Sequence, residues 1–316
     1  MTDIDAALAA RERYWDEHPI ITETAALPTR AVQDAIARVM RLARKGRGSI
    51  AFWADPLVGK STCIKALTRA IHDRIPGAGI LNLESVEDKQ QAEGRVLLDI
   101  LKSIDYAPKI ERELAGKRDQ VARALLGHSG PAKHLFFIID EAQEITNQEF
   151  GWIKAVINKQ VRQGIKTTLA LFGQRELRKR RDEIAQNGRS DLGKRFMGNL
   201  REFRGARSKA DLDVICEAMD ERSEFPEGSN LTYTEFLFPR AYSEGFRFTQ
   251  VASLLWGTIT TGVAASDLRK GLPMEIVAAF LANVCILCKD KDEKGFAVPP
   301  EVVKKALQSA LAGETQ

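Results

Sequence analysis

The segment from Ile50 to Ile64 reads I-A-F-W-A-D-P-L-V-G-K-S-T-C-I, and it constrains the fold more than any other part of the chain. An apolar strand pattern breaks into a loop that ends in Gly59-Lys60-Ser61, and a helical pattern follows. Such a loop points backbone N–H groups at an anion, and the helix adds the positive end of its dipole. We expect Lys60 to reach the β- and γ-phosphates of a nucleotide and the Ser61 hydroxyl to bind Mg²⁺. The segment therefore predicts a phosphate cradle between a buried strand and a helix.

The loop departs at one position from the pattern G-x-x-x-x-G-K-[ST], because Ala54 occupies the place of the first glycine. Gly59 stands where the backbone approaches a phosphate most closely, whereas Ala54 only opens the loop and Pro56 stiffens it. A strand-turn-helix that carries Gly-Lys-Ser by chance is the alternative. The residues expected to line the cradle are Ala54, Pro56, Val58, Gly59, Lys60, Ser61 and Thr62.

A second apolar segment, residues 134–139, ends in Asp140 and Glu141. A buried strand that delivers two carboxylates at its carboxyl end is typical of metal-dependent phosphate hydrolysis. We expect Asp140 to hold Mg²⁺, and Glu141 to orient and polarise the water that attacks the γ-phosphate. An Asp-Glu pair after an apolar strand is often only the start of a helix. A phosphate cradle about eighty residues upstream makes that coincidence improbable.

A third apolar segment, residues 167–172, leads into Gly173 and Gln174. Its indication of a catalytic role is weaker than that of the first two segments. A parallel sheet would place Gln174 beside the γ-phosphate, so we expect it to act as a sensor in catalysis. A solvent-exposed loop glutamine is the alternative interpretation.

Three arginines are candidates for contacts with the γ-phosphate from outside the cradle. Arg195 lies just before a new apolar segment and can project into the site of a neighbouring subunit, where positive charge stabilises the transition state. Arg189 is the next candidate for that role, and a surface arginine is the alternative. Arg247 begins a C-terminal helix and can fold back onto the same nucleotide.

Composition favours a cytoplasmic protein with no membrane partner. The N-terminus is acidic and lacks the pattern of a signal peptide. The longest apolar run, residues 276–288, is too short to span a bilayer. Its two cysteines, Cys285 and Cys288, fit core packing, and neither the cysteines nor the four scattered histidines have the spacing of metal ligands.

The order of the predicted elements indicates an α/β fold. Helices and strands alternate through the first two-thirds of the chain, and only helices follow. We therefore expect an N-terminal segment at 1–28 and a core at 29–208 with a parallel sheet flanked by helices. A small all-helical lid at 209–316 should follow the core. Thr29 is placed to cap the first helix of the core. The expected strands are 49–53, 79–83, 134–139 and 167–172. The expected helices are 30–45, 60–75, 90–104, 109–126, 147–163, 176–184, 210–221, 232–243, 248–261, 273–289 and 299–311.

The motifs A-D-P-L-V-G-K-S, I-I-D-E-A-Q, L-F-G-Q-R-E-L and G-K-R-F occur in the order found in AAA+ ATPases. The chain resembles that superfamily over about residues 20 to 265. The resemblance implies a P-loop NTPase core, ATP and Mg²⁺ as cofactors, and ATP hydrolysis.

Within the superfamily, the D-E-A-Q and G-Q-x-E-L motifs are most similar to those of the DNA-transposition regulators TnsC, TniB and phage Mu B protein. This resemblance implies a protein that forms a ring or helical filament of its own copies on duplex DNA. It also implies that the filament marks target DNA and recruits a transposase and a target-selection protein. ExeA-like ATPases share the same motifs, so an ATPase that acts on protein assemblies without DNA is the alternative.

The charge distribution gives separate support for a nucleic-acid partner. The chain carries a net charge of only +4, but residues 175–209 contain twelve Lys or Arg against five Asp or Glu. Such a cluster can neutralise phosphates, although a solvated helix face or a subunit interface is also possible. The transposition resemblance implies DNA contacts between the second strand and Asp140. The basic residues there are Lys89, Arg95, Lys102, Lys109, Lys117 and Arg118.

Overall fold

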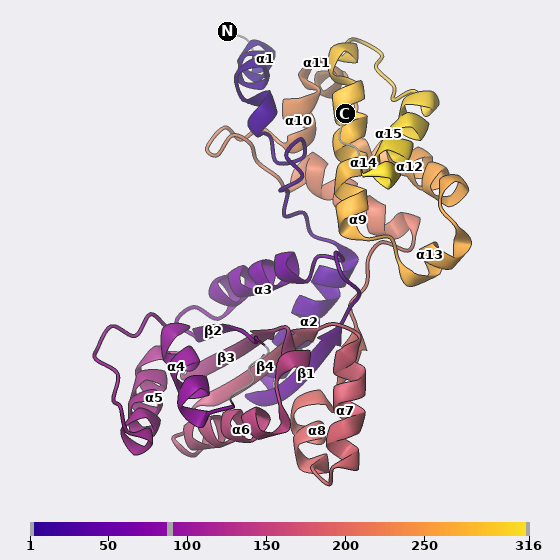
Figure 1. Ribbon diagram of the computed structural model, residues 1–316. Coiled ribbons are helices and arrows are strands. Elements are labelled where there is room, and N and C mark those ends of the chain that lie inside the picture. The colour runs from indigo at the N-terminus through magenta and orange to yellow at the C-terminus, as the bar shows by residue number, and fades with distance from the viewer. Residues whose placement is uncertain (1–2, 87–90, 314–316) are drawn as a thin grey trace. The chain divides into compact units, whose positions relative to one another are not determined.

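The computed structural model describes residues 3–86 and 91–313, which form two compact units (Figure 1). One is an α/β unit, Asp34–Pro56 and Lys60–Phe203. The other is a helical unit made of the described residues of Met1–Gln33, Leu57–Gly59 and Arg204–Gln316. The N-terminal helix α1, Asp3–Tyr14, thus clusters with the C-terminal helices.

The α/β unit is built on a five-stranded sheet in which all neighbouring strands are parallel, in the order β2-β3-β4-β1-β5. This confirms the predicted fold class and its four strands. The fifth strand was missed because it has only three residues, too few for a periodic pattern. The strands are β1 Arg47–Trp53, β2 Gly79–Glu84, β3 His134–Asp140, β4 Lys166–Gly173 and β5 Leu200–Glu202.

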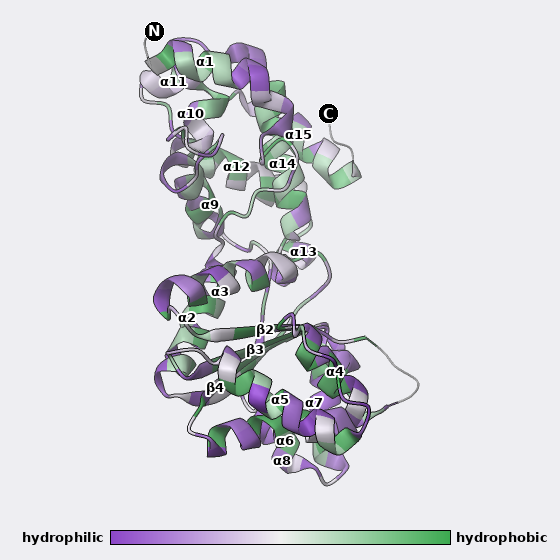
Figure 2. Ribbon diagram, turned by 90° about the vertical axis from the view of Figure 1, so that its left-hand side faces the viewer, coloured by the Kyte–Doolittle hydropathy of each residue, from purple (hydrophilic) through white to green (hydrophobic). Residues whose placement is uncertain are grey.

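Helices cover both faces of this sheet. Helices α2 and α3 lie on one face, and α4, α5, α6 and α8 lie on the other (Figures 1 and 2). Helix α8 was not predicted, and α4 and α5 are shorter than expected. The helices are α2 Arg30–Arg44, α3 Lys60–Arg74, α4 Glu93–Lys102, α5 Leu114–His128, α6 Asn147–Arg162, α7 Glu176–Gln186 and α8 Ser190–Met197.

Alternate residues of the central strands pack against the two helix layers. Phe137 and Leu171 belong to the core shared with α4 to α8. On the opposite face, Phe52 of β1 stacks on Phe172 of β4 with ring centroids 5.1 Å apart. Because both faces are covered, β3 and β4 are buried along almost their whole length.

Side-chain caps fix where several helices begin. The Thr29 hydroxyl accepts the Val32 N–H at 3.2 Å, as predicted for the start of α2. Thr146 and Glu149 form a capping box at the start of α6, directly after the acidic end of β3. The position of α6 is thereby fixed close to Asp140 and Glu141.

The helical unit has its own apolar core, in which Cys285 and Cys288 are buried as expected. The helix predicted over 232–243 is two short helices that break at Phe238, before Pro239. No helix among residues 3–86 and 91–313 combines the length and apolarity that a bilayer crossing needs. The C-terminal helices are α9 Lys209–Glu221, α10 Tyr233–Leu237, α11 Pro239–Ser243, α12 Phe248–Gly262, α13 Ala265–Lys270, α14 Met274–Leu287 and α15 Pro300–Ala312.

A buried histidine makes the stability of the α/β unit depend on pH. The His134 ring stacks on Phe136, and its Nε2 lies 2.9 Å from Oγ1 of Thr168. Burial, together with the nearby charge of Lys166, lowers the pKa of His134 to about 4. Between about pH 6.5 and about pH 4, the unfolded chain therefore binds a proton at His134 that the folded protein does not bind.

We predict that the free energy of unfolding falls as the pH is lowered from about 6.5 to about 4, with a contribution of about 2 kcal/mol or more from His134. The measurement is urea unfolding at several pH values for the wild type and His134→Gln. The variant should be less stable at pH 7.5 and lose less stability on acidification. Parallel pH dependences for the two proteins would contradict this account of His134.

Candidate nucleotide site

The strand order brings the carboxyl ends of three strands to one place. Strand β4 lies between β1 and β3, and Trp53 of β1 pairs with Gly173 of β4. The N–H of Ala54 donates to the carbonyl oxygen of Gly173 at 3.0 Å and continues this ladder into the loop. The loop between β1 and α3 therefore begins against the end of β4, at the edge where parallel α/β sheets bind ligands.

The loop backbone explains why alanine is compatible with the first glycine position. Ala54 is fully buried and does not have a positive φ. Gly59 has φ +91°, a conformation that side chains other than glycine rarely adopt, and α3 begins at the next residue, Lys60. Leu57 also has a positive φ, 62°, with 63% of its surface exposed. No feature of the sequence predicted the positive φ of Leu57.

The end of β3 places two carboxylates at the same edge. Asp140 Oδ1 accepts the N–H of Glu141 at 2.9 Å, and Glu141 has φ 49°. Burial raises the pKa of Asp140, while the Glu141 N–H and the positive charge of Lys60 act in the opposite direction. Lys60 and Asp140 therefore lie close enough to interact electrostatically.

The oxygen atoms at this edge suit Mg²⁺ together with a nucleotide. Mg²⁺ is typically bound by one or two protein oxygens, several waters and substrate phosphates. Ser61, in the first turn of α3, supplies a hydroxyl, and Asp140 supplies a carboxylate whose burial cost a cation would offset. The described residues contain no group of three or more His, Cys, Asp or Glu side chains that could hold a metal ion.

Glu141 and Gln174 are in direct contact. Gln174 Nε2 donates to Glu141 Oε2 at 3.2 Å, and Gln143 Nε2 donates to the same oxygen at 2.6 Å. The side chain of Gln143 in turn accepts the backbone N–H of Gln174 at 2.9 Å. The D-E-A-Q motif by itself predicts no contact for Gln143.

An ion pair ties the loop to the chain that follows β4. Arg175 donates through Nε and Nη2 to the two carboxylate oxygens of Asp55, the Nη2 contact being 2.6 Å. The guanidinium of Arg178 lies 5.0 Å from the ring centroid of Trp53. Sequence reasoning missed both contacts, because residues about 120 positions apart meet only through the strand order.

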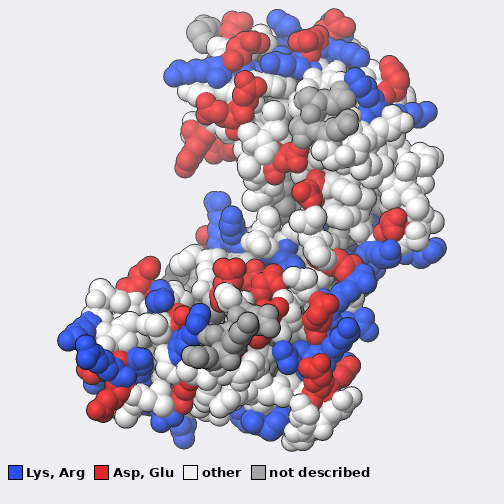
Figure 3. Space-filling model, viewed as in Figure 1, with Lys and Arg blue, Asp and Glu red and all other residues white. Residues whose placement is uncertain are grey.

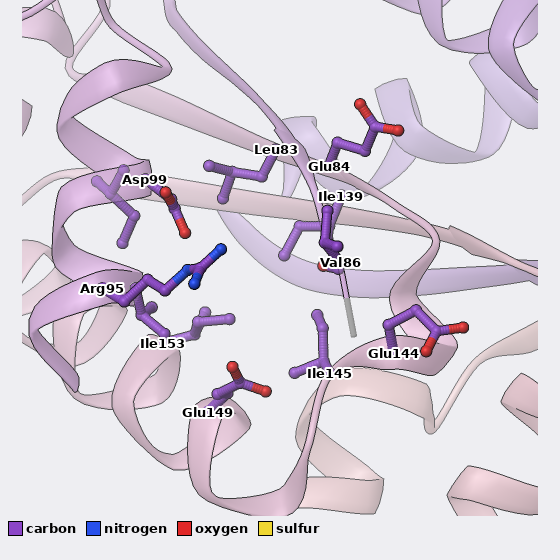
Figure 4. Close-up of a pocket in the computed structure, with 13 residues that line it drawn as sticks. Leu83, Glu84, Val86, Arg95, Asp99, Ile139, Glu144, Ile145, Glu149 and Ile153 are labelled. Carbon is purple, nitrogen blue, oxygen red and sulfur yellow. The ribbon is translucent and has the colours of Figure 1, made fainter. Parts of the chain in front are cut away.

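A pocket of about 150 Å³ lies beside the acidic end of β3 (Figure 4). Apolar residues of β2, β3, α4 and α6 line it, and Figure 4 shows Arg95 pointing into it between Asp99 and Glu149. Glu84 and Glu144 also line the pocket, so its lining contains four carboxylates and one guanidinium. This acidic surrounding disfavours a phosphate contact by Arg95.

The other residues predicted to bind DNA are in varied surroundings. Arg118 donates to both carboxylate oxygens of Glu93, at 2.7 and 2.5 Å. Lys102 and Lys109 are exposed, Lys117 is half-buried, and Lys89 lies outside the described residues. Their role in DNA binding stays a prediction.

Arg195 lies far from the loop of its own subunit. Its carbonyl oxygen accepts a hydrogen bond from the hydroxyl of Ser49, near the amino end of β1. Together with Arg47 and Lys194 it lines a basic cavity of about 400 Å³ at that end. Because β1 has seven residues, its two ends are about 20 Å apart. The next candidate, Arg189, pairs with Asp191 at 3.3 Å.

Arg247 belongs to the helical unit and is bound within it. Its Nη1 donates to the carbonyl oxygens of Tyr242 and Phe246, at 3.0 and 2.6 Å, and its guanidinium lies over the Tyr242 ring. Its contact with a nucleotide stays a prediction.

Most arginines of the basic stretch 175–209 interact with groups of the same chain. Besides Arg175, Arg180 donates to the carbonyl oxygen of Gln143 and Arg181 pairs with Asp182. On the face drawn in Figure 3, Lys and Arg side chains are interspersed with Asp and Glu. Contacts within the chain therefore partly neutralise the positive charge of residues 175–209.

The family model of the AAA domain matches residues 43–180, from the end of α2 into α7. Over these residues the chain is similar to AAA domains. The matched residues include the Gly59-Lys60-Ser61 loop, the Asp140-Glu141 pair and Gln174, and the five-stranded sheet followed by a helical part is the AAA+ fold.

Two solved structures share this fold across most of the chain. The ORC2 protein of Aeropyrum pernix, in ADPNP-ADP complexes, is 13% identical with a TM-score of 0.53, covering 94% of this chain and 72% of that one. Cdc6p of Pyrobaculum aerophilum is 14% identical with a TM-score of 0.54, covering 93% and 71%. At these identities the likeness concerns the fold alone. No curated protein sequence matches the chain.

The two small residues of the loop offer a matched pair of substitutions. We predict that Gly59→Ala weakens Mg-ATP binding by at least about tenfold, because alanine at φ +91° strains the loop. Ala54→Gly restores the consensus, but should leave the affinity within about twofold because the Ala54 backbone does not require glycine.

Isothermal calorimetry with Mg-ATP measures both variants, and thermal unfolding checks their folding. Ala54→Gly should lower the free energy of unfolding by about 1 kcal/mol, since it removes a buried methyl group. A large gain of affinity in Ala54→Gly would mean that the departure from the consensus weakens the cradle.

Proposed function

We propose that this protein is a Mg²⁺-dependent ATPase that assembles on duplex DNA in an ATP-dependent manner. The observation that carries the ATPase proposal is the convergence of the Gly59-Lys60-Ser61 loop, Asp140, Glu141 and Gln174 at one edge of the sheet. An enzyme that hydrolyses a phosphoanhydride needs these groups together: donors and positive charge for the phosphates, an oxygen ligand for the metal and a base for the water. ADPNP and ADP in the ORC2 complexes support nucleotide binding in this fold.

Each residue has a distinct task in this proposal. The backbone N–H groups of the loop and the Lys60 ammonium bind the phosphates, with Pro56, Val58 and Thr62 shaping the loop. Ser61 and Asp140 hold Mg²⁺, which neutralises charge on the transferred phosphoryl group when it is bound. Glu141 accepts a proton from the attacking water, and Gln174 orients the groups around the γ-phosphate.

The proposed assembly of subunits depends on Arg195. It lies at the amino end of β1, about 20 Å from the loop that follows the carboxyl end, so it acts on a nucleotide of another subunit. One end of each subunit then contacts the opposite end of the next, and such head-to-tail contacts generate rings or helical filaments. Loss of the γ-phosphate weakens this contact and loosens the assembly.

The DNA part of the proposal rests on the resemblance to transposition regulators. On that basis the assembled cytoplasmic protein marks target DNA and recruits a transposase and a target-selection protein. DNA recognition would be directed mainly at the backbone, through the basic residues between β2 and β3 and part of the stretch 175–209.

One observation favours a second function, an ATPase that acts on protein assemblies without DNA. Arg175, Arg180, Arg181 and Arg118 all have partners in their own chain, so fewer cations are available for phosphates. The experiment that separates the two functions is binding of labelled duplex DNA with ATP, with ADP and without nucleotide, followed by imaging of the complexes. ATP-dependent rings or filaments on DNA support the first function, and ATP-dependent assembly without DNA binding supports the second.

Blocking hydrolysis should prolong the assembly. We predict that Glu141→Gln binds ATP normally, hydrolyses it at least about 100-fold more slowly, and stays on DNA longer after dilution. Phosphate release and the dissociation rate from labelled DNA measure the two effects. Rapid turnover in Glu141→Gln would remove Glu141 as the general base.

A further inference from the structure

Gln143 lies between the acidic end of β3 and the end of β4, and its side chain forms hydrogen bonds with residues at both strand ends. Only 7% of its surface is exposed. Its Oε1 accepts the backbone N–H of Gln174 at 2.9 Å, and its Nε2 donates to Oε2 of Glu141 at 2.6 Å. The N–H of Gln174 needs an acceptor, so the NH₂ group of Gln143 must face Glu141.

Neighbouring groups hold Gln143 in this place. Two nitrogens of the Arg180 guanidinium donate to its carbonyl oxygen, at 3.3 and 3.2 Å. The absence of a side chain at Gly173 leaves room for its amide, because a Cβ there would lie 2.6 Å from Gln143 Oε1. Three parts of the fold therefore determine where the Gln143 amide lies: the last residue of β4, the first turn after β3 and helix α7.

We propose that Gln143 positions the Glu141 carboxylate for activation of the attacking water and couples it to the end of β4. The inference rests on the proposed ATPase function and assigns the residue that orients its base. Gln143 and Gln174 both donate to Oε2 of Glu141. Among residues 3–86 and 91–313, no side chain or backbone group donates to Oε1, so this oxygen is the one left to accept the proton. A general base must be held within hydrogen-bond reach of the water, and this pair of donors fixes its rotation.

The same amide has a second acceptor. Gln143 Nε2 also lies 3.1 Å from Oε1 of Glu144, and Glu144 lines the pocket of Figure 4. The shorter contact with Glu141 makes Glu141 the main partner. Removing Glu144 therefore leaves the positioning of Glu141 in place.

The first test replaces Gln143 by a residue of similar length that cannot donate. Gln143→Met should lower kcat for ATP by about tenfold or more and leave the Kd for Mg-ATP within about twofold. Added to Glu141→Gln it should cause no further loss of turnover, because the base that it positions is already gone. Unchanged kcat, or an equal loss in both backgrounds, would overturn the proposal.

The second test displaces the amide without changing Gln143. Gly173→Ala places a methyl group against Gln143 Oε1 and should reproduce the fall in kcat with retained Mg-ATP binding. Gly127→Ala is the matched control, since a Cβ there meets nothing within 4 Å, and it should turn over ATP like the wild type. Wild-type kcat in a folded Gly173→Ala variant would contradict the proposed positioning of Glu141 by Gln143.

Failure of the inference is distinguishable from failure of the proposed function. If the wild type binds Mg-ATP but releases no phosphate, with or without duplex DNA, both are overturned. If the wild type releases phosphate and folded Gln143→Met does so at the same rate, only the positioning role of Gln143 fails.

Discussion

The hydrogen bond from the Ala54 N–H to the carbonyl oxygen of Gly173 is the contact on which the candidate site depends. It extends the pairing of β1 with β4 by one residue and fixes where the loop between β1 and α3 starts. The same end of β4 carries Gln174, and the neighbouring strand β3 delivers Asp140 and Glu141. Strand order thus brings together three groups that are distant in sequence.

The polar contacts at this edge follow from that arrangement. Glu141 is flanked by two amides, and Asp55 of the loop pairs with Arg175 just after β4. A buried carboxylate without partners would be costly, and burial already raises the pKa of Asp140. Two neutral amides donate to Glu141, and the positive charge of Lys60 counteracts the effect of burial on the pKa of Asp140.

The sequence was sufficient for the parts of the fold that have strong local signals. Residues 134–139 are apolar enough to predict a strand buried on both faces, and the glycine at position 59 predicts a turn that only glycine tolerates. The short strand Leu200–Glu202 and helix α8 were missed, because three and eight residues carry too little periodicity. Contacts such as Gln143 with Gln174 were missed because they depend on which strands are neighbours, and that order is set by packing of the whole sheet. The left-handed conformation of Leu57 had no signal either, since leucine is not a residue that favours it.

The central claim is that the loop before α3 binds the phosphates of a nucleotide through Lys60. Its most direct test is calorimetric titration of Mg-ATP into the wild type, Lys60→Ala and Lys65→Ala, the last removing an exposed lysine of the same helix. The account predicts that Lys60→Ala raises the Kd by at least about tenfold and that Lys65→Ala binds like the wild type. Equal Kd values for all three proteins would contradict it.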